Sequence, residues 1–351
     1  MRDIAVIGFA QTAYVRQELR HNEVEMLMPV IGEALASSGL SREDIGFVVS
    51  GSSDYLAGQP FAFVNALDAL GCWPPLPESH VEMDGAWALY EAWVRMQHGD
   101  IDAALVYAFG KSSMGDVRDV LTRQLDPYVV APLWPDTISL AALQARALLD
   151  AGRYSERDFA EVAVRSRRDA ASNPAAQLRS SKDADALLEQ LYIASPLRKH
   201  DCPPISDGAA AIVLAAGDAI GRARSRPAWI RGIDHRIEPA SLGARDLTKS
   251  PSTALAAKRA GMDGRPIDVA ELHAPFSHQE LILRDALGLD EQTRINPSGG
   301  ALAANAVMVA GLARIGEAAQ RIIDGDASRV IAHATSGPCL QQNLVCVMEA
   351  A

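Results

Sequence analysis

Histidine and carboxylate side chains stand where the sequence predicts that strands end and helices begin. His273 lies at the end of the apolar run VAELHA (269–274), and Asp84 directly precedes a helical pattern that starts at Gly85. Ligands of α/β proteins gather beyond the carboxyl ends of strands, which makes His273 a candidate site residue. Asp84 is either an N-cap that accepts backbone N–H bonds, the favoured interpretation, or a carboxylate that acts as a base when desolvated.

More candidate residues follow the strand that contains His273. His278 and Glu280 begin the next helical pattern, and either could face a cavity. Glu280 could instead be a first-turn carboxylate stabilised by the helix dipole. Downstream, the run NPSGG (296–300) is typical of a tight turn, because paired glycines let the backbone approach a ligand closely. We therefore expect ligand contacts at both places.

The composition narrows the class of protein. With 351 residues, 48% apolar and 22% charged, the chain has the balance of a soluble globular protein and the length for two related lobes. A net charge of −11 argues against a nucleic-acid-binding surface. No apolar stretch is long enough to cross a membrane and the start shows no leader pattern, so we expect a cytoplasmic protein. The cysteines lack CxxC spacing, so neither a disulfide framework nor a metal site is expected; they are Cys72, Cys202, Cys339 and Cys346.

Short β-rich runs alternate with helical patterns along the chain, which predicts a layered α/β architecture. The predicted strands are 4–8, 47–50, 103–108, 207–216, 228–232, 269–274, 330–334 and 344–348. The predicted helices are 24–38, 85–97, 137–150, 156–168, 253–260, 278–287 and 301–323. Because this succession occurs twice, we expect two similar lobes, 1–216 and 217–351, with an excursion over about 115–200 in the first.

Three of these stretches resemble landmarks of one enzyme family. DGAAAIVLAA (207–216), VAELHAPFSHQE (269–280) and INPSGGALAANAVMVAGLARI (295–315) are similar in order and spacing to the thiolase superfamily. The branch that they resemble holds the sterol-carrier-protein-type thiolases and the lipid-transfer-protein-like proteins of bacterial steroid breakdown. The resemblance covers essentially the whole chain and implies the five-layered αβαβα thiolase fold, with active-site loops between two similar lobes.

Active thiolases use a nucleophilic cysteine, an oxyanion-hole histidine, a Gly-His-Pro histidine, and a second cysteine or related loop. The resemblance places Glu82 or Met83 at the nucleophile position, and Cys72 lies about ten residues too early. Without a thiol there, the usual acyl-enzyme cannot form. His273 matches the oxyanion-hole histidine, which implies that its neutral ring donates to a thioester oxygen as enolate charge develops. The alternative is a core histidine that caps the end of a strand.

The remaining two family elements are changed. After the glycine pair comes an alanine-rich stretch with no histidine, and the segment SGPCLQQNLVCVME (336–349) replaces the Cys-Gly-rich loop. Ser336 or Gly337 then stands at the acid/base position, and Cys339, two residues later, is the one thiol that could restore thiolase chemistry. The candidate substrate-binding residues are Glu82, Asp84, Asn296, Gly299, Gly300 and Gly337.

The resemblance implies retro-aldol cleavage of a steroid side-chain β-hydroxyacyl-CoA, a reaction that needs no nucleophilic cysteine. His273 is then the enolate stabiliser, and the base is His278, Glu82 or Asp84. We expect no tightly bound cofactor, since coenzyme A belongs to the substrate. Four basic residues could meet its phosphates, unless they are solvated surface: Arg165, Arg167, Arg168 and Lys199.

Two other functions remain open at this stage. Loss of three elements out of four also fits a non-catalytic scaffold subunit of a lipid-degrading complex, and the third alternative is an ordinary thiolase acylated on Cys339. The resemblance further implies a homodimer or a heterodimer with a thiolase-like chain, and a small OB-fold, zinc-ribbon-bearing partner.

Overall fold

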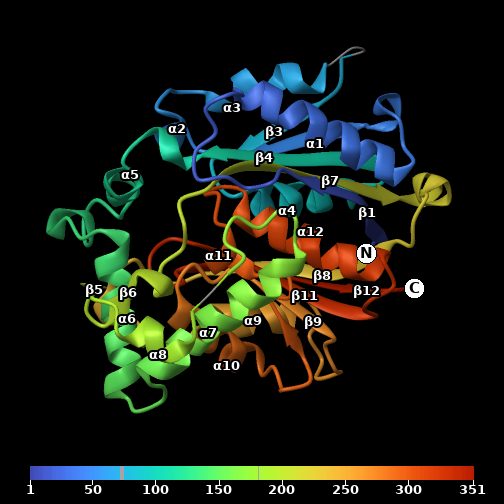
Figure 1. Ribbon diagram of the computed structural model, residues 1–351. Coiled ribbons are helices and arrows are strands. Elements are labelled where there is room, and N and C mark those ends of the chain that lie inside the picture. Colours follow the sequence, from blue (N-terminus) through green and yellow to red (C-terminus); the bar gives the residue numbers. More distant parts are fainter. Residues whose placement is uncertain (72–74, 181) are drawn as a thin grey trace.

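The computed structural model describes residues 1–71, 75–180 and 182–351 (Figure 1). The chain forms a mixed α/β fold around a ten-stranded sheet in the order β10-β9-β11-β12-β8-β1-β7-β4-β2-β3. The strands are β1 (Ile4–Gln11), β2 (Phe47–Gly51), β3 (Glu78–Val81), β4 (Ala103–Lys111), β5 (Tyr192–Ala194), β6 (Leu197–Arg198), β7 (Asp207–Ala216), β8 (Ala228–Ile237), β9 (Val269–Leu272), β10 (Arg294–Ile295), β11 (Arg329–Ser336) and β12 (Gln342–Glu349). The helices are α1 (Glu23–Ser38), α2 (Asp54–Ala57), α3 (Ala62–Ala66), α4 (Gly85–Met96), α5 (Val117–Arg123), α6 (Thr137–Asp150), α7 (Glu156–Asp169), α8 (Ala184–Leu188), α9 (Pro251–Arg259), α10 (Ser277–Leu287), α11 (Gly300–Ala303) and α12 (Ala310–Ile323).

The second half of the sheet repeats the pairing of the first. β1 pairs with β7 and β7 with β4 antiparallel, whereas β4–β2 and β2–β3 are parallel. In the same way β8–β12 and β12–β11 are antiparallel, and β11–β9 and β9–β10 are parallel. A short antiparallel ladder between 4–6 and 228–230 joins the halves. The prediction of two similar lobes is confirmed; the division between residues 216 and 217 stays a prediction.

Three buried clusters separate the layers. The central one lies between the two half-sheets, around α4 and α12 (Figure 1). Leu89 of α4 and Leu312 of α12 are fully buried in it. One outer cluster sits under α1 and includes Leu27 and Ile31, and the other sits under α9 and α10 and includes Leu283. Helices therefore cover both outer faces and fill the middle, as the five-layered fold requires.

The helix predicted over 301–323 is wrong. The structure breaks it into α11 and α12, because Ala304 is extended and Met308 has a φ of +75°. The break lets the Met308 carbonyl accept the Gly85 N–H at 2.9 Å, so the segment 304–309 meets the start of α4. An alanine-rich composition favours helix locally, and this tertiary contact overrides it.

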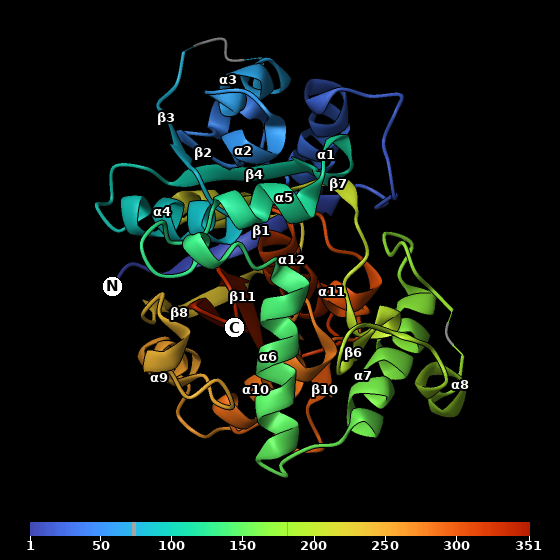
Figure 2. The same ribbon diagram turned by 90° about the vertical axis from the view of Figure 1, so that its left-hand side faces the viewer.

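The excursion between β4 and β7 holds α5 to α8 and the β5–β6 pair, with α6 and α7 in front in Figure 2. The helices predicted at 137–150 and 156–168 are confirmed there. α7 packs against α10 and α11, so the excursion lies against the second lobe near the end of β9. None of the described helices is long and apolar enough to reach across a bilayer.

Candidate active site

His273 follows β9, where its neighbours fix both ring nitrogens. Its Nδ1 accepts the Thr335 N–H at 3.4 Å, and its Nε2 lies 3.2 Å from Oδ1 of Asn305. An Nδ1 that accepts leaves the proton on Nε2, which therefore donates to Asn305. Burial lowers the pKa of His273 to about 4, so the ring is neutral at physiological pH. The site thus offers a neutral N–H donor whose present acceptor is an amide oxygen.

Asn305 is the residue that sequence reasoning missed. It lies in the break between α11 and α12, and its backbone N–H donates to Oγ of Ser206 at 3.0 Å. Ser206 in turn donates to Gln177 at 2.7 Å. The available signal was a single polar residue in an alanine-rich run, which the predicted continuous helix concealed.

The turn at 296–300 contains residues with positive φ, as its glycines predict. Asn296, Gly299 and Gly300 have φ values of +48°, +98° and +61°. A Cβ at Gly299 would lie 2.5 Å from Cβ of Ala170, so a glycine is required there. Oδ1 of Asn296 accepts the Leu272 N–H at 2.6 Å, which ties the turn to the strand end just before His273. The Asn296 amide group therefore holds the turn from inside.

Two ion pairs support this turn, one buried at both side chains and one partly exposed at its arginine. Glu271 accepts from Arg314 at 2.9 Å and from both N–H and O–H of Ser298, at 3.0 and 2.6 Å. Glu280, one of the candidates for a cavity-facing residue, instead lies 2.5 Å from Arg165 and accepts from the Asn296 amide at 2.9 Å. Arg165, a candidate for contact with the phosphates of coenzyme A, is thus paired with Glu280 and only partly exposed.

Asp84 bridges the starts of the two central helices. Oδ1 accepts the N–H groups of Ala86 and Leu312, both at 2.9 Å, and Oδ2 accepts that of Gly311 at 2.8 Å. Burial raises the pKa of Asp84 and the three donors oppose that effect. Both of its oxygens thus accept from α4 and α12, as the N-cap interpretation expects.

Glu82 and His278 have opposite surroundings. Glu82 follows β3, and its side chain is 46% exposed while one oxygen accepts the Asp54 N–H at 2.7 Å. His278 is fully buried, in contact with the rings of Phe159 and Phe276, and its Nε2 lies 3.2 Å from Oε1 of Gln144. Burial lowers the pKa of His278 to about 3, which makes it a poor proton acceptor. Of the candidate bases, Glu82 alone has both an open side chain and a free lone pair.

The loop after β11 begins close to His273, because Thr335 is next to the last residue of that strand. Gly337 has a φ of +72°, and a Cβ there would lie 2.7 Å from the Gln341 side chain. The Cys339 thiol donates to the Leu140 carbonyl at 3.3 Å, and burial raises its pKa to about 12. A buried thiol of this kind supplies almost no thiolate at neutral pH. Cys72 lies outside the described residues.

We therefore expect that acetyl-CoA leaves no acyl group on Cys339. Intact-protein mass spectrometry after incubation at neutral pH should show the unmodified mass, because the thiol is buried and protonated. A brief reaction with an alkylating agent should likewise spare Cys339 in the folded protein and label it after denaturation. An acetylated Cys339 peptide would contradict the expectation and favour thiolase chemistry.

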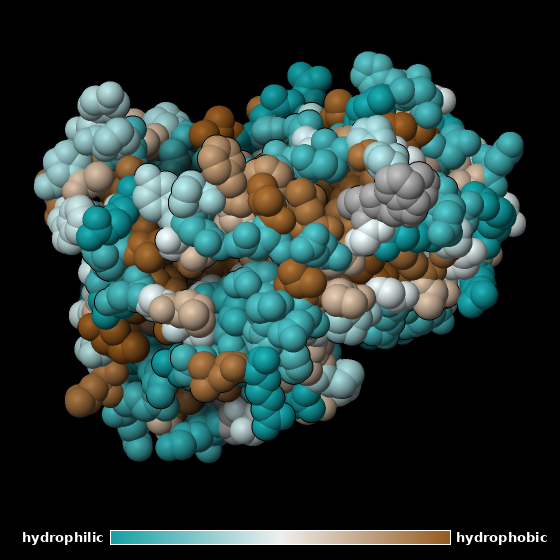
Figure 3. Space-filling model, turned by 90° about the horizontal axis from the view of Figure 1, so that it is seen from above, coloured by the Kyte–Doolittle hydropathy of each residue, from teal (hydrophilic) through white to brown (hydrophobic). Residues whose placement is uncertain are grey.

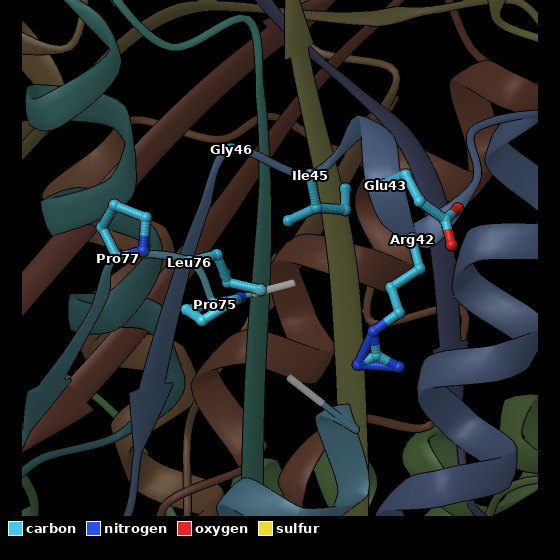
Figure 4. A pocket seen from close by; sticks show the side chains of 7 residues that line it. All are labelled: Arg42, Glu43, Ile45, Gly46, Pro75, Leu76 and Pro77. Atoms are coloured by element: carbon cyan, nitrogen blue, oxygen red, sulfur yellow. The ribbon is translucent and has the colours of Figure 1, made fainter. Parts of the chain in front are cut away.

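A surface cavity of about 230 Å³ lies away from these residues. Arg42 and Glu43 line one side and Pro75, Leu76 and Pro77 the other, as Figure 4 shows. The residues that line it come just before β2 and β3 in the chain. The cavity is therefore at the opposite end of these parallel strands from Glu82, which follows β3. Since α/β ligands bind at the carboxyl ends of strands, we do not assign this cavity to the active site.

Known proteins give a consistent comparison, although no family model matches the chain. Acetyl-CoA acetyltransferase of Methanothermobacter thermautotrophicus is 28% identical over 331 residues, 86% of this chain and 85% of that protein. Sterol carrier protein 2 of Gallus gallus is 24% identical and shares 85% of this chain but 62% of its own length. The 17-hydroxy-3-oxo-4-pregnene-20-carboxyl-CoA lyase of Mycobacterium tuberculosis is 25% identical over 81% of this chain and 78% of its own.

Among solved structures, the Ltp2-ChsH2(DUF35) aldolase has the same fold. It superposes with a TM-score of 0.83 at 19% identity, covering 99% of this chain and 98% of that one. This superposition over nearly the whole chain, together with the ten-stranded sheet, shows that the chain has the thiolase fold. The resemblance to the thiolase superfamily, and to its sterol-carrier-protein and lipid-transfer-protein-like branch, that the sequence predicts is confirmed.

Proposed function

We propose that this chain is an acyl-CoA-dependent carbon–carbon lyase that cleaves a steroid side-chain β-hydroxyacyl-CoA without a covalent acyl-enzyme. The observation that carries the proposal is the neutral His273, whose Nε2–H faces an amide carbonyl oxygen of Asn305 at 3.2 Å. A thioester carbonyl that replaced this oxygen would receive the same hydrogen bond. That bond strengthens as the oxygen gains enolate charge, which is the condition for catalysis.

The reaction needs two groups in addition to the substrate. A base removes the β-hydroxyl proton, the bond between the α and β carbons breaks, and a ketone or aldehyde leaves. The bonding pair becomes the thioester enolate, which His273 stabilises until a proton restores an acyl-CoA. We assign the base to Glu82, because Asp84 is engaged by three N–H donors and His278 is sealed in the core.

The comparisons with relatives of low sequence identity support this choice of chemistry. One relative is a lyase that acts on a steroid carboxyl-CoA, and the solved structure with the same fold is called an aldolase. The buried thiols of Cys202, Cys339 and Cys346, whose pKa values burial raises to about 12, fit a reaction without acyl-enzyme. The steroid is the part of the proposal that rests on the relatives.

We also propose that this chain acts together with partner chains. The similar aldolase carries the names of two proteins, Ltp2 and ChsH2(DUF35), and we propose that this chain also works with others. We expect a homodimer or a heterodimer with a thiolase-like chain, and a small OB-fold, zinc-ribbon partner in addition. Apolar side chains break the polar surface over the first lobe in Figure 3. Met28 of α1, Phe61 just before α3 and Val64 of α3 are 56%, 69% and 50% exposed, and we propose that the partner covers them.

Replacing His273 by alanine tests the function. With a steroid side-chain β-hydroxyacyl-CoA, and with the co-purified partner present, we expect release of a ketone or aldehyde that falls about 10²–10³-fold in His273→Ala, the usual cost of losing one oxyanion donor. The exposed His98→Ala is the matched control and should keep wild-type activity. Equal activity in wild type and His273→Ala would overturn the role of this residue.

The scaffold alternative predicts a different result in the same assay. A non-catalytic subunit would release no product alone, and its partner's activity would be unaffected by His273→Ala. We prefer the lyase because the neutral Nε2–H of His273 already meets a carbonyl oxygen, the group that a thioester would present.

A further inference from the structure

We infer that Ser50 and His80 form a positioning line behind Glu82, a role that rests on the proposed function and extends it. The register of the parallel strands β2 and β3 places Ser50 directly beside His80. Oγ of Ser50 lies 3.1 Å from Nδ1 of His80, and Nε2 of the same ring lies 3.6 Å from Oε2 of Glu82. The other oxygen of Glu82 accepts the Asp54 N–H, so both carboxylate oxygens have a neighbour.

Exposure increases along this line. Ser50 is 1% exposed, the His80 side chain is 15% exposed and the Glu82 side chain is 46% exposed. The inner members are therefore held by the protein while the outer carboxylate is free to meet a substrate. Such an order, in which a buried group orients a ring and the ring orients the reacting group, is how acid–base groups are positioned in many enzymes.

The geometry selects one tautomer of His80. A proton on Nε2 points at the Glu82 carboxylate, and Nδ1 then accepts the Ser50 O–H. The opposite tautomer would turn a lone pair towards the carboxylate, which is unfavourable. Ser50 therefore acts through His80 by fixing which nitrogen carries the proton.

Packing holds the ring in this orientation. The Phe63 ring stacks on His80 with centroids 4.5 Å apart and planes 14° from parallel. The 3.6 Å between His80 and Glu82 is too long for a direct hydrogen bond. Catalytic contacts often shorten when substrate binds, so we expect the bond to form in the complex.

The tautomer can be measured without any activity. In protein labelled with ¹⁵N at histidine, long-range ¹H–¹⁵N spectra should show the His80 proton on Nε2, with resonances assigned by the loss of signals in His80→Gln. In Ser50→Ala the two tautomers should mix, whereas Ser50→Thr, which keeps the hydroxyl, should match wild type. A proton on Nδ1 in the wild type would overturn the inference.

Kinetics then test the consequence. In the lyase assay, Ser50→Ala and His80→Ala should lower kcat by about 10²-fold with KM nearly unchanged, because a misplaced base slows the chemical step. Ser50→Thr should recover most of the activity, and added imidazole should partly restore His80→Ala. If wild type is active and the variants keep its kcat, the positioning line is refuted and the lyase stands. If wild type is inactive with its partner, the proposed function fails, and the tautomer spectra still report on Ser50 and His80.

Discussion

Arg314→Met is expected to lower the free energy of unfolding by about 3–5 kcal/mol, the usual cost of removing one partner of a buried ion pair. Arg314 and Glu271 are 4% and 0% exposed at the side chain, and their closest atoms are 2.9 Å apart. Without the guanidinium, Glu271 keeps only the two donors of Ser298 for a buried negative charge. Urea unfolding followed by circular dichroism measures the loss.

The control for Arg314→Met separates the charge from the lost volume. The double variant Glu271→Gln/Arg314→Met should be more stable than Arg314→Met alone, because glutamine is neutral and can still accept from Ser298. Arg123→Met removes a partner of an exposed pair with Asp119 and should change stability too little to resolve. If the double variant loses as much free energy of unfolding as Glu271→Gln and Arg314→Met lose together, the unpaired charge of Glu271 is not the cause.

Asp84→Asn should lower the free energy of unfolding by about 2–4 kcal/mol, more than a single cap contributes. The substitution keeps the shape, but the new NH₂ group meets a backbone N–H instead of accepting it. It also removes a negative charge that lies at the positive ends of two helices, α4 and α12. Thermal and urea unfolding should agree on the direction.

The exposed N-cap at Asp116 provides the comparison for Asp84. Asp116 caps α5 alone, with N–H donors at 3.0 and 3.3 Å, so Asp116→Asn should cost much less. An Asp84→Asn variant as stable as wild type would show that the bridge between α4 and α12 contributes little. A variant that is stable but inactive would favour the interpretation of Asp84 as a base.

Local pattern was enough for elements with a continuous apolar run or a clear helical period. The strand at 207–216 and the helix at 137–150 have the predicted ends, because continuous apolar runs and helical periodicity determine them. The strand β3 was absent from the prediction, since Glu78–Val81 is short, polar and paired only with β2. The break at 304–309 depends on the start of α4, more than 200 residues away, which no local pattern reports.

The sequence likewise predicted some residues of the candidate site and missed others. His273 could be found because a local motif surrounds it, and so could the turn of Asn296, Gly299 and Gly300. The groups that fix its proton, Asn305 and Thr335, are 32 and 62 residues away along the chain. They reach His273 because the fold brings β9, β11 and the segment before α12 together. The residue types alone do not predict this contact.

The place of β1 in the sheet has a consequence for synthesis on the ribosome. β1 ends at Gln11 and lies between β7 and β8, which begin at Asp207 and Ala228. At a synthesis rate of about 5–20 residues per second, about 10–40 s pass between the synthesis of this apolar strand and that of its first neighbour in the sheet. Both edges of the strand IAVIGFAQ thus lack their hydrogen-bonding partners on the nascent chain throughout that interval. Chaperone occupancy and expression yield should therefore respond to changes in β1 that leave the finished protein's activity intact.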